Sequence, residues 1–396
     1  MIFSKKAQEM APSLTLVIDA KAKKMKQDGI DVIGFGAGEP DFNTPENIQD
    51  AAIDAIRKGL TRYTPASGIA ELKNAIVKKF KEDNNLTYSP SQIIISTGAK
   101  QSLNNIFQAI LNPGDEVIVQ VPYWVSYPEL IKLADGVPVF ADTKEENNFK
   151  YTMDELNKIV TDKTKAILLN SPNNPTGTVY TEMELREIAE FAKTHDLIII
   201  SDEIYEKLIY GNEKHISIAS LSQDAYERTI VVNGVSKSYA MTGWRIGYAA
   251  GSEAVVKIMS NIQSHTTSNP NSIAQYASVE ALNGEQDTIE LMSKEFKNRR
   301  DFMVERINCI NNLSCVKPAG AFYVMVNISK VLDKTVNGQK IGDSIKFAEL
   351  LLDKEKVAVV PGAAFGVDNY IRLSYATSME NIKNGLDRIE KFINTL

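Results

Sequence analysis

The chain has 396 residues, of which 43% are hydrophobic and 24% are charged, and its formal net charge is -6. These are ordinary values for a globular protein with a large core, and the length suggests two domains, or one large and one small. The acidic balance argues against nucleic acid as a partner, although it allows a local cationic pocket.

The first residues, 1–6, carry no apolar signal-peptide segment, and no hydrophobic run approaches the ~18 residues of a membrane span. We therefore expect a soluble, cytoplasmic protein that does not bind a membrane. The spacing of the two cysteines matches neither a zinc ribbon nor a redox pair, which favours reduced structural thiols. The three histidines are scattered, so neither residue type predicts a metal site: Cys309, Cys315, His195, His215 and His265.

Residues 12–29 predict a helix that ends at a glycine, and a glycine-rich stretch, 34–42 (GFGAGEPDF), follows it. A dinucleotide-binding loop would need a further glycine opening a helix, but position 39 is glutamate and Pro40 prevents a helix from following. The glycines favour close approach of the backbone to a small ligand, and an ordinary loop is the alternative.

A helix is predicted to start at Thr44 and Pro45, because proline suits the first helical turn and apolar residues follow at helical spacing. The turn-rich loop 62–68 (RYTPASG) comes next. Its tyrosine, Tyr63, is expected to be exposed, and by itself it predicts only a surface residue.

Residues 93–96 (IIIS) predict a buried strand, and the turn 97–100 (TGAK) leads into a helix over 101–111. Small residues at such a turn, here Gly98 and Ala99, expose backbone N–H groups at the positive end of the helix, which suits a phosphate group. Many turns of this kind bind nothing, so a purely structural turn remains open.

A strand over 115–120 precedes Trp124, which on its own predicts only a core or surface aromatic residue. A strand over 165–169 ends in the segment 170–177 (NSPNNPTG). Because its prolines interrupt regular structure, the asparagine side chains, Asn174 among them, are expected to be exposed for contact with a polar ligand. A rigid turn is the alternative.

A helix over 182–193 precedes an apolar strand over 197–201, and Asp202 follows directly. A carboxylate at the end of an apolar strand either caps a helix or pairs with a buried cation. Tyr205 comes three residues later.

Residues 229–232 predict a further strand, followed by a small-residue turn with Lys237 and a β-type segment, 245–250, that begins at Arg245. The lysine can offer an amine for covalent chemistry with a carbonyl, and the arginine a fixed fork for an oxyanion or a phosphate. From the spacing alone, a solvated loop lysine beside a surface arginine is the more frequent outcome.

Strands alternate with helices over 93–250, which predicts a mainly parallel, doubly wound sheet. Asn170, Asp202 and Lys237 each follow the carboxyl end of a strand, where open α/β sheets bind ligands. We therefore expect these three residues to lie in one binding site.

A long helical stretch over 271–311 is expected to link a large domain to a small domain. The large domain is predicted to span 44–285, and the small domain to combine 1–43 with 286–396. In the small domain a strand over 370–375 (YIRLSY) carries Arg372, and a strand arginine usually pairs with an acidic neighbour or points to water.

These segments together resemble the fold-type-I pyridoxal phosphate (PLP) enzymes, in particular the class I aminotransferases and their aspartate aminotransferase branch. The resemblance rests on the lysine segment 236–245 (SKSYAMTGWR), on 170–177 (NSPNNPTG) and on 372–376 (RLSYA). It implies an α/β fold in which a mainly parallel, doubly wound sheet in a large domain is joined by a smaller α/β domain from both termini.

In this family the matching lysine, here Lys237, forms a Schiff base with the cofactor and then moves the substrate proton. Asp202 matches the carboxylate that pairs with the protonated pyridine nitrogen, a charge that makes the ring an electron sink. At Gly234 the chain departs from many relatives, which carry a hydroxyl residue toward the phosphate. Further residues match contacts to the ring, the 3′-oxygen and the phosphate: Trp124, Asn174, Tyr205, Gly98, Ala99, Ser236 and Arg245.

The resemblance also implies a substrate site. Arg372 matches the arginine that clamps the α-carboxylate of the amino acid, and Gly38 matches the glycine whose backbone meets the same group. Trp124 and Asn174 are shared between cofactor and substrate.

Tyr63 matches a tyrosine that reaches the cofactor phosphate of the neighbouring subunit, so it implies a homodimer. No arginine matches the distal-carboxylate arginine of the other large branch of aspartate aminotransferases. Lys100 is the candidate replacement, because the macrodipole disfavours a cation at the start of a helix and the lysine there invites a functional explanation.

The implied activity is transfer of the amino group of L-aspartate to 2-oxoglutarate in ping-pong half-reactions. Aromatic, alanine or prephenate-type substrates remain alternatives. So does a PLP-dependent β-lyase, which would share nearly every cofactor residue. A non-catalytic PLP-dependent regulator would carry an added DNA-binding domain, for which the chain has no room.

Overall fold

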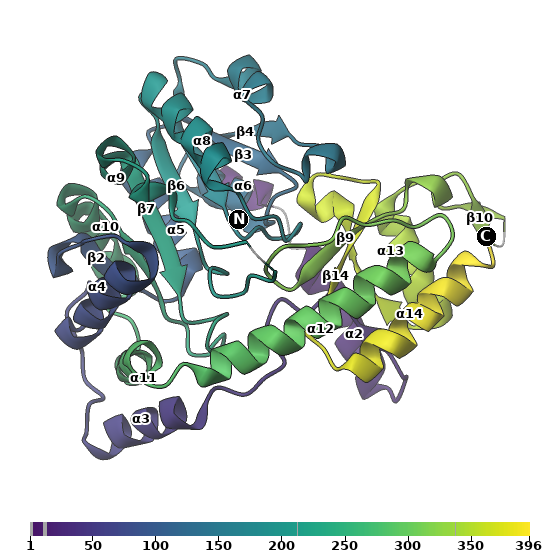
Figure 1. Ribbon diagram of the computed structural model, residues 1–396, viewed down its shortest axis with the longest axis horizontal. Helices are drawn as coiled ribbons and strands as arrows, with labels where there is room; N and C mark the ends of the chain where they lie inside the picture. The colour runs from purple at the N-terminus through teal and green to yellow at the C-terminus, as the bar shows by residue number, and fades with distance from the viewer. Residues whose placement is uncertain (1–2, 11–13, 212, 337) are drawn as a thin grey trace.

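The computed structural model describes residues 3–10, 14–211, 213–336 and 338–396. Its largest feature is a seven-stranded sheet with the strand order β2-β8-β7-β6-β5-β3-β4 (Figure 1). Six strands are parallel to one another, and β8 is antiparallel to both of its neighbours. The strands are β2 (Ile93–Ser96), β3 (Glu116–Val121), β4 (Val137–Asp142), β5 (Thr164–Asn170), β6 (Ile198–Asp202), β7 (Thr229–Gly234) and β8 (Gly247–Ala250).

The central strands are apolar because both faces of the sheet are covered. Alternate residues of β5 pack to opposite sides: Leu168 lies in the cluster with α5, α6 and α10, and Ile167 in the cluster with α8. Helices α4 and α11 cover the β2 end through Ile93 and Ile95. The predicted doubly wound α/β sheet is confirmed. The helices of this part are α3 (Glu46–Arg57), α4 (Ala70–Asn84), α5 (Ala99–Ile110), α6 (Ser126–Leu133), α7 (Met153–Ile159), α8 (Glu182–Thr194), α9 (Gln223–Arg228), α10 (Glu253–Thr266) and α11 (Ser272–Asn283).

A second group of elements lies at the other end of the molecule in Figure 1 and combines both ends of the chain. Near the N-terminus, β1 pairs in parallel with β12 close to the C-terminus, and β9 and β13 flank β14 in an antiparallel sheet. This arrangement confirms a smaller α/β part built from both termini. Its elements are α2 (Leu14–Gln27), β1 (Ile33–Gly34), α12 (Asp287–Cys309), β9 (Tyr323–Asn327), β10 (Thr335–Val336), β11 (Gln339–Lys340), α13 (Ser344–Glu355), β12 (Val357–Ala358), β13 (Val360–Pro361), β14 (Tyr370–Ser374) and α14 (Met379–Ile393). Helix α1 (Lys5–Glu9) lies against the larger part instead, because the Lys6 amine donates to the carbonyl of Leu133 at 3.1 Å and pairs with Asp135 at 2.7 Å.

The helical stretch predicted over 271–311 consists of two helices, α11 and α12. Gly284 follows α11 with an extended backbone, and the Gln286 side chain donates to the carbonyls of Ala281 and Gly284 at 3.0 and 2.8 Å. These bonds satisfy carbonyls at the end of α11 and allow the chain to turn before α12 starts. The predicted domain boundary at 285 falls in this break, and the division into domains stays a prediction.

Two further boundaries differ from the sequence-based expectation. Arg245 is not part of a strand: β8 starts at Gly247, and the backbone of Arg245 is left-handed, with a φ of 58°. The helix predicted over 12–29 is α2, Leu14–Gln27, and residues 12 and 13 lie outside the described part of the chain.

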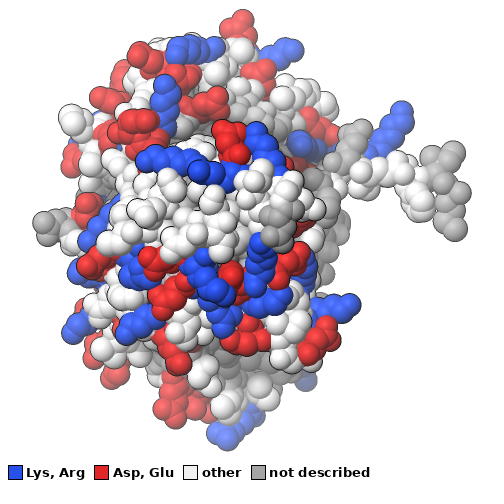
Figure 2. Space-filling model, turned by 90° about the vertical axis from the view of Figure 1, so that its right-hand side faces the viewer, with Lys and Arg blue, Asp and Glu red and all other residues white. Residues whose placement is uncertain are grey.

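Charges of both signs are interspersed over the face shown in Figure 2. Ion pairs also join α14 to its neighbours: Arg306 of α12 bonds Asp387 and Glu390 at 2.7 and 2.9 Å, and Lys391 bonds Glu355 at 2.8 Å. Among the described residues, no helix combines the length and the apolar character needed to cross a membrane.

Candidate active site

Most of the predicted site residues lie at or near the carboxyl edge of the sheet, and Tyr63 does not join them within this chain. The strand register places Asn170 at the end of β5 beside Asp202 at the end of β6, and Ser96 at the end of β2 beside Gly247 at the start of β8. Because β8 is antiparallel, its first residues lie at the edge where the parallel strands end. The turns after β2, β6 and β7 and the segment before β8 therefore surround one region (Figure 1).

Lys237 lies in the turn after β7, and its amine donates a hydrogen bond of 2.5 Å to the backbone carbonyl of Gly38. The same nitrogen lies 5.8 Å from the ring centroids of Tyr205 and Phe322. The lysine is thus held between the large sheet and the glycine-rich stretch near the N-terminus.

The environment of Lys237 favours its neutral amine. Burial lowers its pKa, and the charges of Arg245 and Arg372 lower it further, while Glu39 and Asp202 oppose the shift; the resulting pKa is about 8. An amine with such a pKa can act both as a nucleophile and as a proton acceptor near neutral pH.

Asp202 is a buried carboxylate, with only 3% of its surface exposed. The hydroxyl of Tyr127 donates to its Oδ2 at 2.8 Å, and the backbone N–H of Ile204 donates to its Oδ1 at 3.2 Å. Burial raises the pKa of Asp202 to about 6, although both hydrogen bonds oppose the rise. Such a carboxylate gains most from a cationic partner, because pairing offsets the cost of its burial.

The turn at Gly98 and Ala99 and the side chain of Arg245 form a potential anion-binding site. Gly98 has a φ of 83° and immediately precedes α5, which starts at Ala99. A Cβ on Gly98 would overlap the guanidinium of Arg245, and a Cβ on Gly247 would overlap the backbone of Ala99. The absence of side chains at both glycines thus brings a guanidinium and a helix N-terminus to the same place.

Two more residues belong to this region. Ser236 is buried at the turn after β7, next to Lys237. Gly234 is packed tightly, since a Cβ there would lie 2.9 Å from the carbonyl oxygen of Ile246 and 3.0 Å from the Cα of Gly247. A hydroxyl residue at 234 would need the neighbouring strand to shift.

Arg372, on β14, is almost fully buried at 3% exposure and faces the large sheet. It donates from Nη1 to Oδ1 of Asn174 at 3.1 Å and from Nη2 to the carbonyl of Gly36 at 3.0 Å. Its Nε is buried without a hydrogen-bond partner among the described residues. The expectation that Asn174 would be exposed was wrong, because this segment packs under the smaller sheet and Asn174 is only 6% exposed.

Tyr205 brings a phenol to the same region, and a second tyrosine accompanies it. The hydroxyls of Tyr205 and Tyr323 are 3.0 Å apart and hydrogen-bonded. The ring of Tyr323 also lies 4.2 Å from Cζ of Arg372. The sequence did not predict a contact for Tyr323, because it lies 118 residues from Tyr205 in the chain.

Trp124 and Lys100 lie together at the border of the region. The Trp124 ring packs edge-on against Tyr127, with 5.2 Å between ring centroids, and the Lys100 amine lies 4.9 Å from the Trp124 ring. Lys100 is exposed as a whole residue, yet the packing around its amine lowers its pKa, and the charge of Arg245 adds to this effect. Lys100 thus places a cation beside a flat aromatic surface.

Tyr63 is the predicted site residue with the least contact to the rest of its own chain. It is 91% exposed, more than any other described large hydrophobic or aromatic side chain that is exposed. The predicted exposure of Tyr63 is thus present, and its contact with another subunit stays a prediction.

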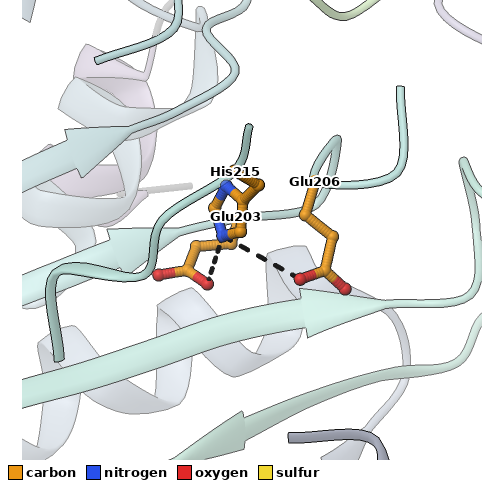
Figure 3. Close-up of side chains that lie close together, drawn as sticks. All are labelled: Glu203, Glu206 and His215. Carbon is orange, nitrogen blue, oxygen red and sulfur yellow. Dashed lines mark hydrogen bonds and ion pairs between the residues drawn. The ribbon is translucent and has the colours of Figure 1, made fainter. Parts of the chain in front are cut away.

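The turn after β6 carries a second set of polar groups that sequence reasoning missed. Ligand atoms of Glu203, Glu206 and His215 lie within 4.8 Å of one another, and Figure 3 shows the imidazole facing both carboxylates. His215 Nε2 is 2.9 Å from Glu203, and Lys79 of α4 forms a close ion pair with Glu206. Because an ammonium already neutralises Glu206, the cluster is a buried ionic network and not a cation site.

The chemistry of this edge follows from its groups. It offers a reactive amine, a buried carboxylate suited to a cationic ring nitrogen, an anion seat at a helix N-terminus and a buried guanidinium with a free donor. A phosphorylated heteroaromatic carbonyl compound together with a carboxylate substrate would use all of them.

Comparison with known proteins agrees with this chemistry. Residues 30–389 match the family described as aminotransferase class I and II. An aspartate aminotransferase of Bacillus subtilis (strain 168) is 52% identical over 393 residues, which cover 99% of each chain. The aspartate aminotransferase structure from Rhizobium meliloti is 42% identical, covers 100% of both chains and has a TM-score of 0.97. That of Thermus thermophilus with maleate is 42% identical, covers 99% of both chains and has a TM-score of 0.93.

Proposed function

The chain belongs to the aminotransferase class I and II family, and from that premise we propose that it moves the amino group of L-aspartate to 2-oxoglutarate, giving oxaloacetate and L-glutamate. Its cofactor is pyridoxal phosphate, on which the family depends. We choose aspartate over the alternative substrates, and an aminotransferase over a β-lyase, because the chain is 52% identical over its full length to an aspartate aminotransferase. Maleate, the ligand of the Thermus thermophilus relative, is a dicarboxylate as aspartate is.

The residues at the carboxyl edge fit pyridoxal phosphate. The bare Gly98 and the start of α5 beside Arg245 suit its phosphate, and the buried carboxylate of Asp202 suits a protonated ring nitrogen. The unpartnered Nε of Arg372 leaves a donor for a carboxylate. We assign cofactor contacts to Gly98, Ala99, Trp124, Asn174, Asp202, Tyr205, Ser236, Lys237 and Arg245, with Tyr63 from the neighbouring subunit, and substrate contacts to Gly38, Lys100, Trp124, Asn174 and Arg372.

When bound, pyridoxal phosphate supplies an electrophilic aldehyde and an electron-withdrawing ring. Lys237 supplies the base: its pKa, lowered to about 8 mainly by burial, leaves about a tenth of the amine neutral at pH 7, far more than for an ordinary lysine. This amine takes the proton from the substrate Cα and returns it to the carbon that receives the amino group. Lys237 is therefore the catalytic residue.

Arg372 is set up in advance to bind the α-carboxylate. Asn174 and Gly36 hold its two terminal nitrogens, and its guanidinium packs 4.2 Å from Tyr323 and 5.0 Å from Phe365. Because the fork is already ordered and shielded from water, substrate binding loses little side-chain entropy and gains a strong charge-assisted contact.

Selection of a dicarboxylate needs a second cation, and Lys100 is our candidate. Its amine lies beside the exposed border of the region, above the Trp124 ring. The position at the start of α5 is unfavourable for a cation in the field of the helix, so a substrate carboxylate would relieve a local electrostatic cost.

A substrate panel tests the proposed function. The PLP-loaded protein is mixed with aspartate, glutamate, alanine or phenylalanine, and conversion from the pyridoxal to the pyridoxamine absorbance is followed in single turnovers. We expect kcat/KM for aspartate and glutamate to exceed the other values by roughly 10-fold or more, the range of one charge-assisted contact. An S-substituted cysteine added to the panel would instead identify a β-lyase, if it released a thiol, pyruvate and ammonia without giving a new amino acid.

We further propose a homodimer with shared sites, in which Tyr63 of each chain contacts the cofactor phosphate held by the other. The 91% exposure of Tyr63 in the single chain supports this assignment, since an exposed aromatic residue is available to a second chain. The dimer and a cytoplasmic location both stay predictions.

A further inference from the structure

Tyr323, at the start of β9, contacts two proposed site residues and lies close to a third. Its hydroxyl is hydrogen-bonded to that of Tyr205 at 3.0 Å, and its ring lies 4.2 Å from the guanidinium carbon of Arg372. A Cβ on Gly38 would lie 3.5 Å from the same hydroxyl. Tyr323 is only 1% exposed, so these contacts are fixed by packing.

The number of hydroxyl hydrogens limits which of the two tyrosines, Tyr205 or Tyr323, can donate the hydrogen bond between them. Burial raises the pKa of both phenols, so both are protonated at neutral pH and the pair holds two hydrogens. The bond between the hydroxyls uses one hydrogen, and the other remains for a ligand. If Tyr205 donates to a ligand oxygen, Tyr323 must be the donor to Tyr205, because a phenol has a single O–H.

We propose that Tyr323 is a positioning residue that donates its hydroxyl hydrogen to Tyr205, which keeps the hydrogen of Tyr205 available to the phenolic oxygen of pyridoxal phosphate, while its ring supports Arg372. This role rests on the proposed function. It means that one side chain, Tyr323, supports both Tyr205 and Arg372. The cofactor contact of Tyr205 and the carboxylate contact of Arg372 are thereby tied to the same element, β9.

A consequence for the cofactor follows. A phenol that accepts one hydrogen bond is a stronger donor, so the Tyr323 hydroxyl strengthens the bond from Tyr205 to the cofactor oxygen. A bond donated to the deprotonated form of a chromophore lowers its pKa. Removal of the Tyr323 hydroxyl should therefore raise the pKa of the lysine-linked cofactor chromophore.

The test is a spectrophotometric pH titration of holoenzyme variants in the absence of amino acid. We expect Tyr323→Phe to raise the chromophore pKa by roughly half to one unit, the equivalent of one hydrogen bond, and Tyr205→Phe to raise it further. The double variant should match Tyr205→Phe alone, since the effect of Tyr323 passes through Tyr205. Tyr375→Phe is the matched control, because Tyr375 is buried in the same cluster and donates to the carbonyl of Ala321 at 3.2 Å.

A second measurement separates the hydroxyl from the ring. Tyr323→Phe keeps the ring beside Arg372, so it should lower kcat for aspartate while KM stays within about 3-fold, whereas Tyr323→Leu should also raise KM roughly 3- to 30-fold.

A chromophore pKa that does not move in Tyr323→Phe, or shifts that add in the double variant, would overturn the proposal. Because the titration uses no substrate, a shift as expected supports the role of Tyr323 even if aspartate proves to be the wrong amino acid. If the wild type forms no lysine-linked chromophore, both proposals fail.

Discussion

The hydroxyl of Tyr127 donates a hydrogen bond of 2.8 Å to Oδ2 of Asp202, and this bond joins α6 to the end of β6. The carboxylate is therefore fixed by a side chain from another strand-to-helix connection. Its pKa is raised to about 6 by burial, and the Tyr127 bond limits that rise.

Replacement of Asp202 should slow catalysis with little effect on the fold. Asp202→Ala removes the proposed anion for the ring nitrogen, and one charge-assisted contact contributes about 1.5–3 kcal/mol, or roughly 10- to 100-fold in kcat. Tyr127→Phe removes only the supporting bond, so its loss should be smaller. Steady-state kinetics and urea unfolding of both variants check this, and an Asp202→Ala enzyme within a factor of two of wild type would mean that the ring is seated elsewhere.

Lys237→Ala should abolish transamination and the covalent PLP adduct that borohydride reduction traps, because no other amine occupies this position in the proposed site. In the cofactor-free wild type the adduct forms through the neutral amine. Since burial lowers the pKa of Lys237 to about 8, the rate of adduct formation should rise with pH and level off above pH 8, whereas an ordinary lysine would rise to about pH 10.5. Mass spectrometry after reduction gives the adduct; its persistence in Lys237→Ala would contradict the assignment.

Lys100→Ala should change selectivity more than overall activity. If its ammonium meets the side-chain carboxylate, kcat/KM for aspartate and glutamate should fall roughly 10- to 100-fold while the values for alanine and phenylalanine are spared. Lys132→Ala is the control, because Lys132 is an exposed lysine that pairs with Glu129 at 3.0 Å. Equal losses on all four amino acids would assign Lys100 to the cofactor or the fold.

The shared site can be tested by mixing subunits. In a hybrid of Tyr63→Phe and Lys237→Ala chains, a Tyr63 that reaches across the dimer leaves one site with both native residues. We expect this site to bind PLP as tightly as the wild type, whereas the Tyr63→Phe homodimer should bind it roughly 10-fold more weakly. A hybrid without any tight site would mean that Tyr63 serves its own chain.

The buried ionic network of Glu203, Glu206, His215 and Lys79 should make the free energy of unfolding depend on pH in the acidic range. Burial alone would raise the pKa of Glu206, but Lys79, His215 and Asn84 lower it to about 2. A depressed carboxyl pKa stabilises the fold fully above its ordinary value of 4.5, and this contribution is lost as the pH falls from 4.5 toward 2.

Lys79→Met leaves Glu206 buried without its cation and should lower the free energy of unfolding at pH 7 by roughly 3–5 kcal/mol. A Lys79→Met/Glu206→Leu double variant should recover most of that loss and should also be less sensitive to acid. Urea titrations between pH 7 and pH 3 measure both effects, and a single variant as stable as the wild type would contradict the assigned pairing.

The sequence predicted the residues that follow strand ends, because an apolar strand followed by a polar or small residue is a local pattern. Asp202, Lys237 and Gly98 were found in this way. Tyr127 and Tyr323 were missed because the partners of their hydroxyls lie 75 and 118 residues away in the chain. No local pattern encodes such a contact.

Other differences have similar causes. The break between α11 and α12 depends on the Gln286 side chain reaching back to carbonyls, which helical periodicity does not register. His215 seemed isolated in the sequence, yet the chain returns after β6 and places it 2.9 Å from Glu203. The burial of Asn174 depends on the smaller sheet, whose position above the segment 170–177 is a tertiary property.

The reversed direction of β8 has a consequence for how the site can vary. A parallel strand in this place would begin at the opposite edge of the sheet, so the chain would have to cross over and Arg245, just before the strand, would lie away from Lys237. The antiparallel return keeps Lys237 and Arg245 within one short excursion between β7 and β8. Insertions in this excursion would change the spacing of amine and guanidinium directly, whereas insertions at the opposite edge of the sheet would leave it untouched. Length variation in the connection between β7 and β8 should therefore impair the site.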